Sequence, residues 1–318
     1  MDRCPHPKCS ADDNITCSLG HIKLANCPEW KKAVQTSTST QPNQQDELAV
    51  PWSGSALGES DLNFISGRGK PITVGIVGPE SSGKTTVLAA FYLVLGRGNL
   101  TSEDSLFSSS YTLAGWEAVA NNLRWKPGQQ APHFPPHTTS RAARAPGMLH
   151  LAFRRQDGSL RDLLFADAPG EWFQKWSVNQ QSSEAEGARW IAKHADVTLL
   201  IADRQALAGP VKGTARNEFQ LLAQRAVAES QGRRLALVWT KGDVEVAPAM
   251  EAQIRKALGS TASNVPEFTV SVFKRGEVEA AEGFQKLFSW ILETKRLGVQ
   301  LPTSEVAGHD PLFRYGRR

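Results

Sequence analysis

The sequence predicts an α/β fold in which helices cover both faces of a mostly parallel sheet. Short apolar runs rich in β-branched residues, typical of buried strands, alternate with longer segments of helical spacing. The first apolar run ends in a glycine-rich loop, from which a helix starts. Because buried strands separated by helices need crossover connections, this alternation favours parallel strands covered on both faces.

Each predicted element follows from one of two patterns, an apolar β-branched run or apolar residues at helical spacing. In chain order, the predicted elements are a strand at 71–78, helices at 83–95 and 112–125, strands at 148–155 and 161–168 around a turn at 156–158, a helix at 183–194, a strand at 195–203, a helix at 215–231, a strand at 234–240, a helix at 248–258, a strand at 267–273 and a helix at 277–296.

The composition is that of an ordinary globular protein. Of 318 residues, 40% are hydrophobic and 21% are charged, which excludes a disordered chain, a collagen-like repeat and a coiled-coil rod. The net charge of +4 makes nucleic acid an unexpected partner. The apolar run at 87–95 is far shorter than the ~18–20 residues of a membrane span. The charged N-terminus does not resemble a secretory signal, so we expect a cytoplasmic protein without a membrane span.

Cysteine residues are confined to the N-terminal segment. The chain has four, at Cys4, Cys9, Cys17 and Cys27. In a reducing compartment, clustered thiols are more typical of metal ligands than of disulfides, and zinc prefers four thiolate or imidazole ligands. We therefore predict a zinc knuckle over residues 1–30 with these four cysteines as ligands, or with His21 in place of Cys17. Free thiols, or disulfides in an exported protein, are the alternatives.

The phosphate loop is the strongest motif. Residues 78–85 read GPESSGKT and match G-x-x-x-x-G-K-[ST], between a predicted strand and a predicted helix. We expect its backbone N–H groups to surround phosphate oxygens, Lys84 to bridge the β- and γ-phosphates, and the Thr85 hydroxyl to bind Mg²⁺. The residues predicted to contact the nucleotide here are Gly78, Pro79, Glu80, Ser81, Ser82, Gly83, Lys84, Thr85 and Thr86.

A second motif follows a later strand, where the chain reads D-A-P-G-E from Asp167 to Glu171. A carboxylate at the end of a strand can hold Mg²⁺, which assigns that role to Asp167. Gly170 can approach closely enough for its N–H to meet a γ-phosphate, a contact that is lost on hydrolysis.

A third motif selects the base. Residues 240–243 read T-K-G-D at the end of a strand. The Asp243 carboxylate can accept hydrogen bonds from guanine N1–H and the N2 amino group, which adenine lacks. The Lys241 stem can pack over the purine, and the backbone N–H of Ser271 can meet guanine O6.

These three motifs, in this order, resemble the translation-factor-related (TRAFAC) class of P-loop GTPases over about residues 70–295. The chain is also similar to double-GTPase-type members of bacterial conflict systems. The resemblance implies a P-loop NTPase three-layer sandwich over residues 70–297, with Thr240 in place of the usual Asn. Glu171 stands where a Gln or His usually orients the attacking water, so we expect slow intrinsic hydrolysis.

The resemblance also implies a switch threonine that closes over Mg²⁺ and the γ-phosphate. The only suitable loop is 135–147, in which Thr139 is preferred to Thr138. Arg141 and Arg144 lie nearby, either as an internal arginine finger or as part of a solvated basic loop.

The remaining regions complete the predicted organisation. Residues 31–69 form a polar flexible linker, an insert lies at about 97–137, and residues 298–318 form a tail. The sequence thus predicts a Mg²⁺-dependent GTP-binding and GTP-hydrolysing switch. A protein partner would read its switch loops or its zinc knuckle. A nucleotide-binding interaction module with little hydrolysis, or an ATPase with a degenerate base site, are the alternatives.

Overall fold

The computed structural model describes residues 56–98, 105–124, 147–259, 264–273 and 280–294. The chain divides into two compact units, Met1–Pro51 and Trp52–Arg318, and every described residue belongs to the second. The predicted knuckle at 1–30 therefore lies outside the described residues.

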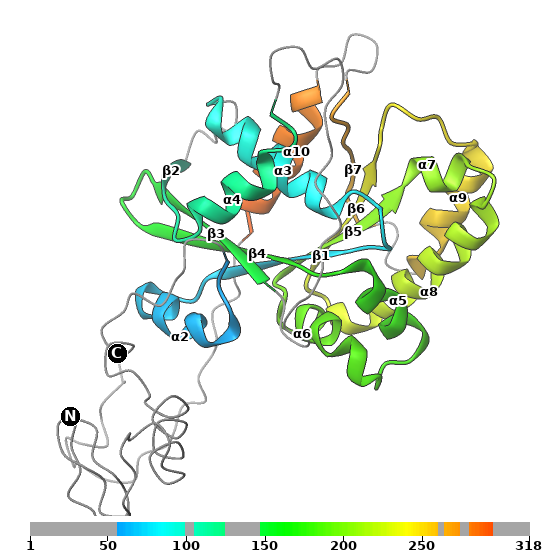
Figure 1. Ribbon diagram of the computed structural model, residues 1–318, viewed down its shortest axis with the longest axis horizontal. Helices are drawn as coiled ribbons and strands as arrows, with labels where there is room; N and C mark the ends of the chain where they lie inside the picture. The colour runs from blue at the N-terminus through cyan, green and yellow to red at the C-terminus, as the bar shows by residue number, and fades with distance from the viewer. Residues whose placement is uncertain (1–55, 99–104, 125–146, 260–263, 274–279, 295–318) are drawn as a thin grey trace, which may run out of the picture. The chain divides into compact units, whose positions relative to one another are not determined.

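A seven-stranded sheet forms the centre of this unit (Figure 1), with the strand order β2-β3-β4-β1-β5-β6-β7. Strands β4, β1, β5, β6 and β7 run parallel to one another, whereas β3 runs antiparallel to both β2 and β4. The strands are β1 (Ile72–Val77), β2 (Ser105–Ser109), β3 (Gly147–Arg155), β4 (Leu160–Asp167), β5 (Val197–Asp203), β6 (Arg234–Thr240) and β7 (Glu267–Thr269).

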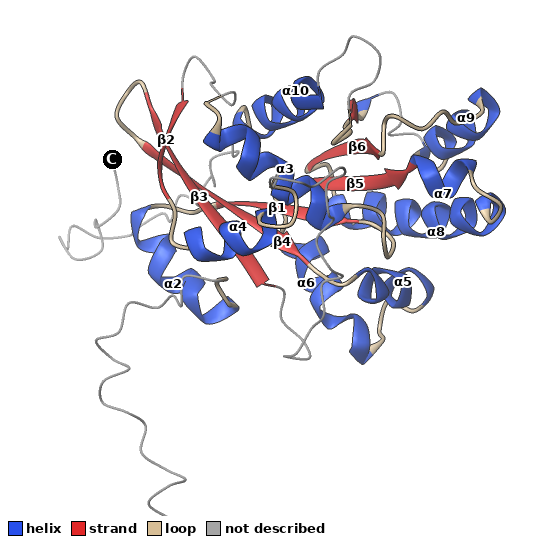
Figure 2. Cartoon of the chain, turned by 45° about the horizontal axis from the view of Figure 1, so that its top comes forward, coloured by secondary structure: helices blue, strands red, loops and turns tan. Residues whose placement is uncertain are grey.

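Helices pack on both faces of the sheet (Figure 2), and each face has its own hydrophobic core. One face is covered by α3, α4 and α10, and the other by α5, α6, α8 and α9. The helices are α2 (Leu62–Ile65), α3 (Lys84–Gly96), α4 (Leu113–Ala120), α5 (Gly170–Val178), α6 (Glu186–His194), α7 (Arg204–Ala208), α8 (Lys212–Ser230), α9 (Pro248–Lys256) and α10 (Ala280–Leu292), with short 3-10 helices η2 (Glu59–Asp61), η3 (Ser66–Arg68) and η4 (Ser183–Ala185).

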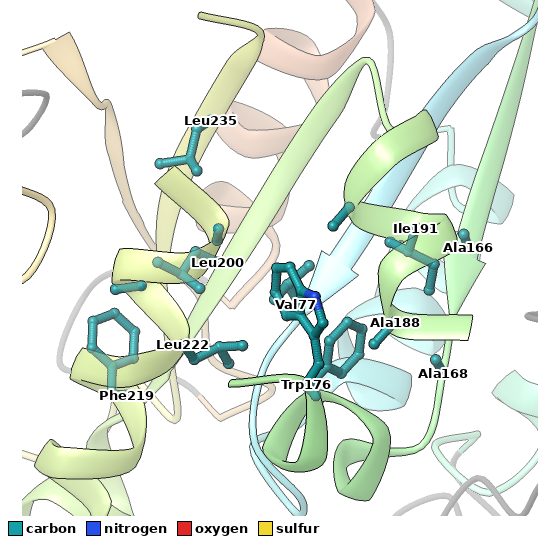
Figure 3. Close-up of a cluster of buried hydrophobic side chains, with 14 of the residues drawn as sticks. Val77, Ala166, Ala168, Trp176, Ala188, Ile191, Leu200, Phe219, Leu222 and Leu235 are labelled. Carbon is teal, nitrogen blue, oxygen red and sulfur yellow. The ribbon is translucent and has the colours of Figure 1, made fainter. Parts of the chain in front are cut away.

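The central strand β1 shows why the strands appear in the sequence as continuous apolar runs. All six of its positions are buried. Ile76 packs in the core beneath α3, α4 and α10, while Val77 packs in the opposite core against residues such as Trp176 and Ile191 (Figure 3). A strand covered on both faces needs apolar side chains on both, so its sequence does not alternate.

The predicted fold class is confirmed as a mixed α/β structure whose mostly parallel sheet fits a P-loop NTPase sandwich. Two strands or helices lie in segments predicted to be a linker or an insert, namely α2 in the linker and β2 in the insert. Helices α5 and α7 were also not predicted. Several predicted elements are shorter than expected; the largest differences are in β7, which ends at Thr269, and in α4, which ends at Ala120. In the described part of the chain, no helix is long and apolar enough to cross a membrane.

The last part of the predicted linker, residues 56–69, is ordered against the sheet. The backbone N–H of Leu57 donates to the Met148 carbonyl at 2.9 Å, and the Met148 N–H returns a bond of 3.0 Å. Leu57 and Ile65 are only 2% and 1% exposed and belong to the core on the α5–α6 face. The structure differs from the predicted linker here because Leu57 and Ile65, although polar residues surround them in the sequence, are buried in the core against the sheet.

We expect Ile65→Ala to lower the free energy of unfolding by about 2–4 kcal/mol, because it opens a cavity in a packed core. The neighbouring Phe64 is 50% exposed, so Phe64→Ala should cost less than half as much. Chemical denaturation of both variants measures the difference. Equal and small losses would show that residues 56–69 do not belong to the cooperative fold.

Candidate nucleotide-binding site

The loops that follow the parallel strands surround a pocket of about 810 Å³. Parallel strands end at the same edge of a sheet, so the segments after β1, β4, β6 and β7 converge there. The predicted site residues that line this pocket are Glu80, Ser81, Ser82, Gly83, Lys84, Thr85, Thr86, Gly170, Glu171, Thr240, Lys241, Asp243 and Ser271.

Other predicted site residues are placed differently. Gly78 and Pro79 belong to the phosphate loop, and Asp167 is the last residue of β4, but none of the three lines the pocket. Thr139, Arg141 and the cysteines lie outside the described residues.

The phosphate loop curls because two of its residues adopt left-handed backbone conformations. Ser81 has φ 58° and Gly83 has φ 89°. Glycine adopts this region without strain, whereas for serine it costs free energy and is typical of functional loops. The Ser82 hydroxyl donates to the Pro79 carbonyl at 2.8 Å and closes the loop internally. Such a curled loop before a helix N-terminus is suited to binding an anion.

The Lys84 ammonium lies at the base of this loop. Its Nζ donates to the Gly78 carbonyl at 3.1 Å and to the Pro79 carbonyl at 2.7 Å, and the residue is only 6% exposed. Burial lowers the pKa of Lys84, while the carboxylates of Asp167 and Glu80 oppose that shift. A buried ammonium that is bound to two carbonyls would be stabilised further by phosphate oxygens.

The side-chain oxygens of Thr85 and Asp167 lie next to each other at the edge of the sheet. The Thr85 hydroxyl donates to Asp167 Oδ2 at 3.0 Å, which joins the first turn of α3 to the end of β4. Among the described residues, no group of three His, Cys, Asp or Glu side chains could hold a metal. A hydroxyl and one carboxylate fit Mg²⁺, which usually binds through few protein ligands together with phosphate oxygens and water.

Gly170 brings helix α5 into contact with the phosphate loop. A Cβ atom at this position would lie 2.3 Å from both the backbone N and the Cα of Glu80. No side chain can fit there, so glycine is needed for the approach. The close contact places the start of α5, including the exposed Glu171, beside the phosphate loop.

The base motif is tied directly to the phosphate loop. The Thr240 hydroxyl donates to the Ser82 carbonyl at 2.7 Å in the protein interior. Lys241 Nζ donates to the Ser81 carbonyl at 3.2 Å and forms an ion pair with Asp203 at 2.7 Å. These bonds fix the distance between the two ends of the pocket.

At the other end of the pocket, Asp243 is oriented by the segment after β7. The Ser271 hydroxyl donates to Asp243 Oδ1 at 2.6 Å, and the Gly242 N–H donates to the Val270 carbonyl at 3.0 Å. The sequence had suggested only a backbone role for Ser271, on the base itself. Its side chain instead holds the carboxylate that the sequence assigns to base recognition.

Comparison with known proteins shows the family to which the chain belongs. A model of the family described as Double-GTPase 2 (DO-GTPase2) matches residues 72–291, more than half of the chain. The chain belongs to the Double-GTPase 2 family. This family is of the P-loop GTPase type, and its name supports GTP binding. No curated protein matches the chain.

Some residues of this Double-GTPase 2 site were not found from the sequence. Asp203 was not among the predicted site residues. Its carboxylate binds Lys241 of the base motif and also accepts hydrogen bonds from the N–H groups of Gln205 and Ala206 at the start of α7. Its position at the end of a predicted strand was the one feature of the sequence that could have placed it near the site. Apolar wall residues belong to no motif and gave no signal: these are Trp172, Val270, Val272, Phe273 and Phe284.

Gly170→Ala should separate α5 from the phosphate loop, because the added methyl group overlaps the Glu80 backbone. We expect a loss of about 1–3 kcal/mol in unfolding free energy from the overpacking. Binding of a nucleoside triphosphate should weaken more than binding of the diphosphate, since Gly170 borders the loop that is predicted to surround the terminal phosphate.

Gly213→Ala is the matched control, because no atom lies within 4 Å of its added Cβ. Thermal unfolding and nucleotide titration of both variants test this prediction, which fails if Gly170→Ala behaves like Gly213→Ala.

Proposed function

We propose that this protein is a Mg²⁺-dependent GTP-binding and GTP-hydrolysing molecular switch with slow intrinsic hydrolysis. The observation that carries the proposal is a single pocket lined by Lys84 at one end and Asp243 at the other. Membership of a GTPase-type family supports it. Because the base motif is hydrogen-bonded to the phosphate loop, one nucleotide can engage both ends at once.

In the phosphate half, Lys84 would exchange its carbonyl partners for β- and γ-phosphate oxygens. The Thr85 hydroxyl and the Asp167 carboxylate would hold Mg²⁺, which supplies charge neutralisation of the triphosphate. Gly170 would sense the γ-phosphate through its backbone N–H. Thr139, which lies outside the described residues, is proposed as the switch threonine on the resemblance alone.

In the base half, Asp243 would accept hydrogen bonds from N1–H and the N2 amino group of guanine. The Ser271 hydroxyl occupies one carboxylate oxygen of Asp243 and orients the side chain. Adenine offers no donors at these positions, so the carboxylate would lose its partners in a complex with ATP. The Lys241 stem would pack over the purine.

Slow hydrolysis follows from the acidic side chains near the phosphate end. Glu171 and Glu80 both line the pocket and both are exposed. A carboxylate can bind the attacking water, but its negative charge opposes the charge on the phosphate oxygens. Because hydrolysis by the protein alone is expected to be slow, we propose that a protein partner reads the switch loops. We also propose that the protein acts in the cytoplasm.

Glu171 also favours a second candidate function, a nucleotide-binding interaction module that hydrolyses GTP poorly or not at all. The two functions differ in the fate of bound GTP. A single-turnover assay separates them, since intact GTP after several hours would favour the module.

Lys84→Ala tests the nucleotide site. We expect wild-type protein to bind GTP and GDP at micromolar or lower concentration with Mg²⁺ present, and the variant to lose at least about tenfold in affinity, as expected when a charged hydrogen-bonding partner is removed. Isothermal titration measures both. Binding of ATP but not of GTP would overturn the guanine assignment and favour the ATPase alternative.

We also propose that Cys4, Cys9, Cys17 and Cys27 bind one structural zinc ion, with His21 as the alternative to Cys17. The support is the sequence pattern alone, since these residues lie outside the described part of the chain. Metal analysis of purified protein should give about one zinc per chain, consistent with a four-ligand site. A metal-free preparation with an unchanged unfolding temperature would contradict the assignment.

A further inference from the structure

Arg204 is a buried cation directly beside the base motif. It follows Asp203 at the end of β5, and its side chain is only 9% exposed. Its Nη2 donates to Glu251 Oε1 on α9 at 2.6 Å, and its guanidinium lies 5.2 Å from the centroid of the Trp239 ring. These contacts hold the guanidinium between β6 and α9.

The same guanidinium holds the loop that contains Asp243. Arg204 Nη1 donates to the backbone carbonyl of Val244 at 3.2 Å, one residue beyond Asp243. On the other side of Asp243, Lys241 forms an ion pair of 2.7 Å with Asp203, the residue that precedes Arg204. Two consecutive residues at the end of β5 thus fix both flanks of residues 241–244.

Burial of this charge is difficult to explain by stability alone. Removing a guanidinium from water is costly, and apolar side chains of similar volume often replace a buried ion pair without loss of stability. The Nε atom of Arg204 has no hydrogen-bond partner among the described residues, which adds to this cost. The bond to Val244 is a contact that an apolar side chain could not make.

We propose that Arg204 is a positioning residue that sets selectivity for guanine over adenine nucleotides. This inference rests on the proposed function, in which Asp243 recognises guanine. Arg204 restrains Val244 and thereby Asp243 at a fixed distance from the phosphate loop, to which Thr240 is bonded. Adenine does not use the Asp243 carboxylate, so a loosened loop weakens guanine binding while adenine binding stays nearly constant.

The test uses the full-length protein and competition of GDP and ADP against a fluorescent GDP analogue. For Arg204→Met we expect GDP to bind about tenfold more weakly and ADP to change by less than about threefold, as expected for one lost charge-assisted hydrogen bond. The GDP-to-ADP selectivity ratio therefore falls. A purely structural role would weaken both nucleotides by the same factor, and that result overturns the proposal.

Arg255→Met is the matched control. Arg255 also faces the Trp239 ring, at 5.7 Å, and also binds Glu251, at 3.2 Å, but it forms its second ion pair with Glu267 instead of a bond to the base loop. We expect this variant to keep the wild-type selectivity ratio even if its stability falls. A ratio that falls as far as in Arg204→Met would overturn the proposal.

Arg204→Lys keeps the test decisive if the methionine variant does not fold. A lysine retains the charge opposite Glu251, but a single ammonium lacks the fork that joins Glu251 to Val244. A lower GDP-to-ADP ratio in a folded lysine variant supports the proposal, and an unchanged ratio overturns it. If the wild-type protein itself shows no preference for GDP, the proposed guanine site fails; if only the variants fail to change the ratio, the proposed function stands.

Discussion

The site depends on one buried hydrogen bond, from the Thr240 hydroxyl to the Ser82 carbonyl. This bond joins the end of β6 to the middle of the phosphate loop, so the two halves of the pocket cannot move independently. Without this hydrogen bond, the buried Ser82 carbonyl would lack a partner and destabilise the fold by its full desolvation penalty, so the bonded arrangement is strongly favoured. The bond between Lys241 and Ser81 adds a second link at the surface. The length of ligand that the pocket accepts is thereby set by the protein.

The sheet makes this connection possible. In the parallel pair β5–β6, Asp203 lies directly opposite Thr240, and so the acid that holds Lys241 arrives beside the base motif. Side chains 38 residues apart in the chain meet because parallel strands end together. The next residue, Arg204, donates a hydrogen bond to the Val244 carbonyl in the same loop. One strand end supplies both restraints on the segment around Asp243.

Much of the architecture could be predicted because it is encoded locally. The buried strands are recognisable from apolar runs, and the phosphate loop from fixed glycine spacing before a helix. The strand β2 could not be predicted, since its serine-rich sequence has little strand preference and is extended only by pairing with β3. Helix α5 begins with Gly170, a poor helix former, and is stabilised by burial of Trp172, Phe173 and Trp176.

The hydrogen bonds between side chains of the site could not be predicted either, because they join residues that are distant in the sequence. Ser271 and Asp243 come from different loops, and only the pairing of β6 with β7 brings them together. Arg204 resembles an ordinary surface arginine in the sequence, because nothing local indicates that Trp239 and Glu251 will cover it. Motifs predict which residues meet a ligand, whereas the residues that hold those motifs in place become visible only after folding.

Helix α5 connects the phosphate end of the site to the opposite side of the sheet edge. Its first residue, Gly170, touches the phosphate loop, and two residues later Trp172 packs against α6 so closely that a Cβ on Gly187 would lie 2.0 Å from the ring. A tightly packed ring cannot slide without moving its neighbour. Under the proposed switch function, a γ-phosphate that displaces Gly170 must therefore either shift α6 as well or withdraw Trp172 from its contact with Gly187. In both cases the change at the phosphate loop is transmitted through α5 to its contact with α6.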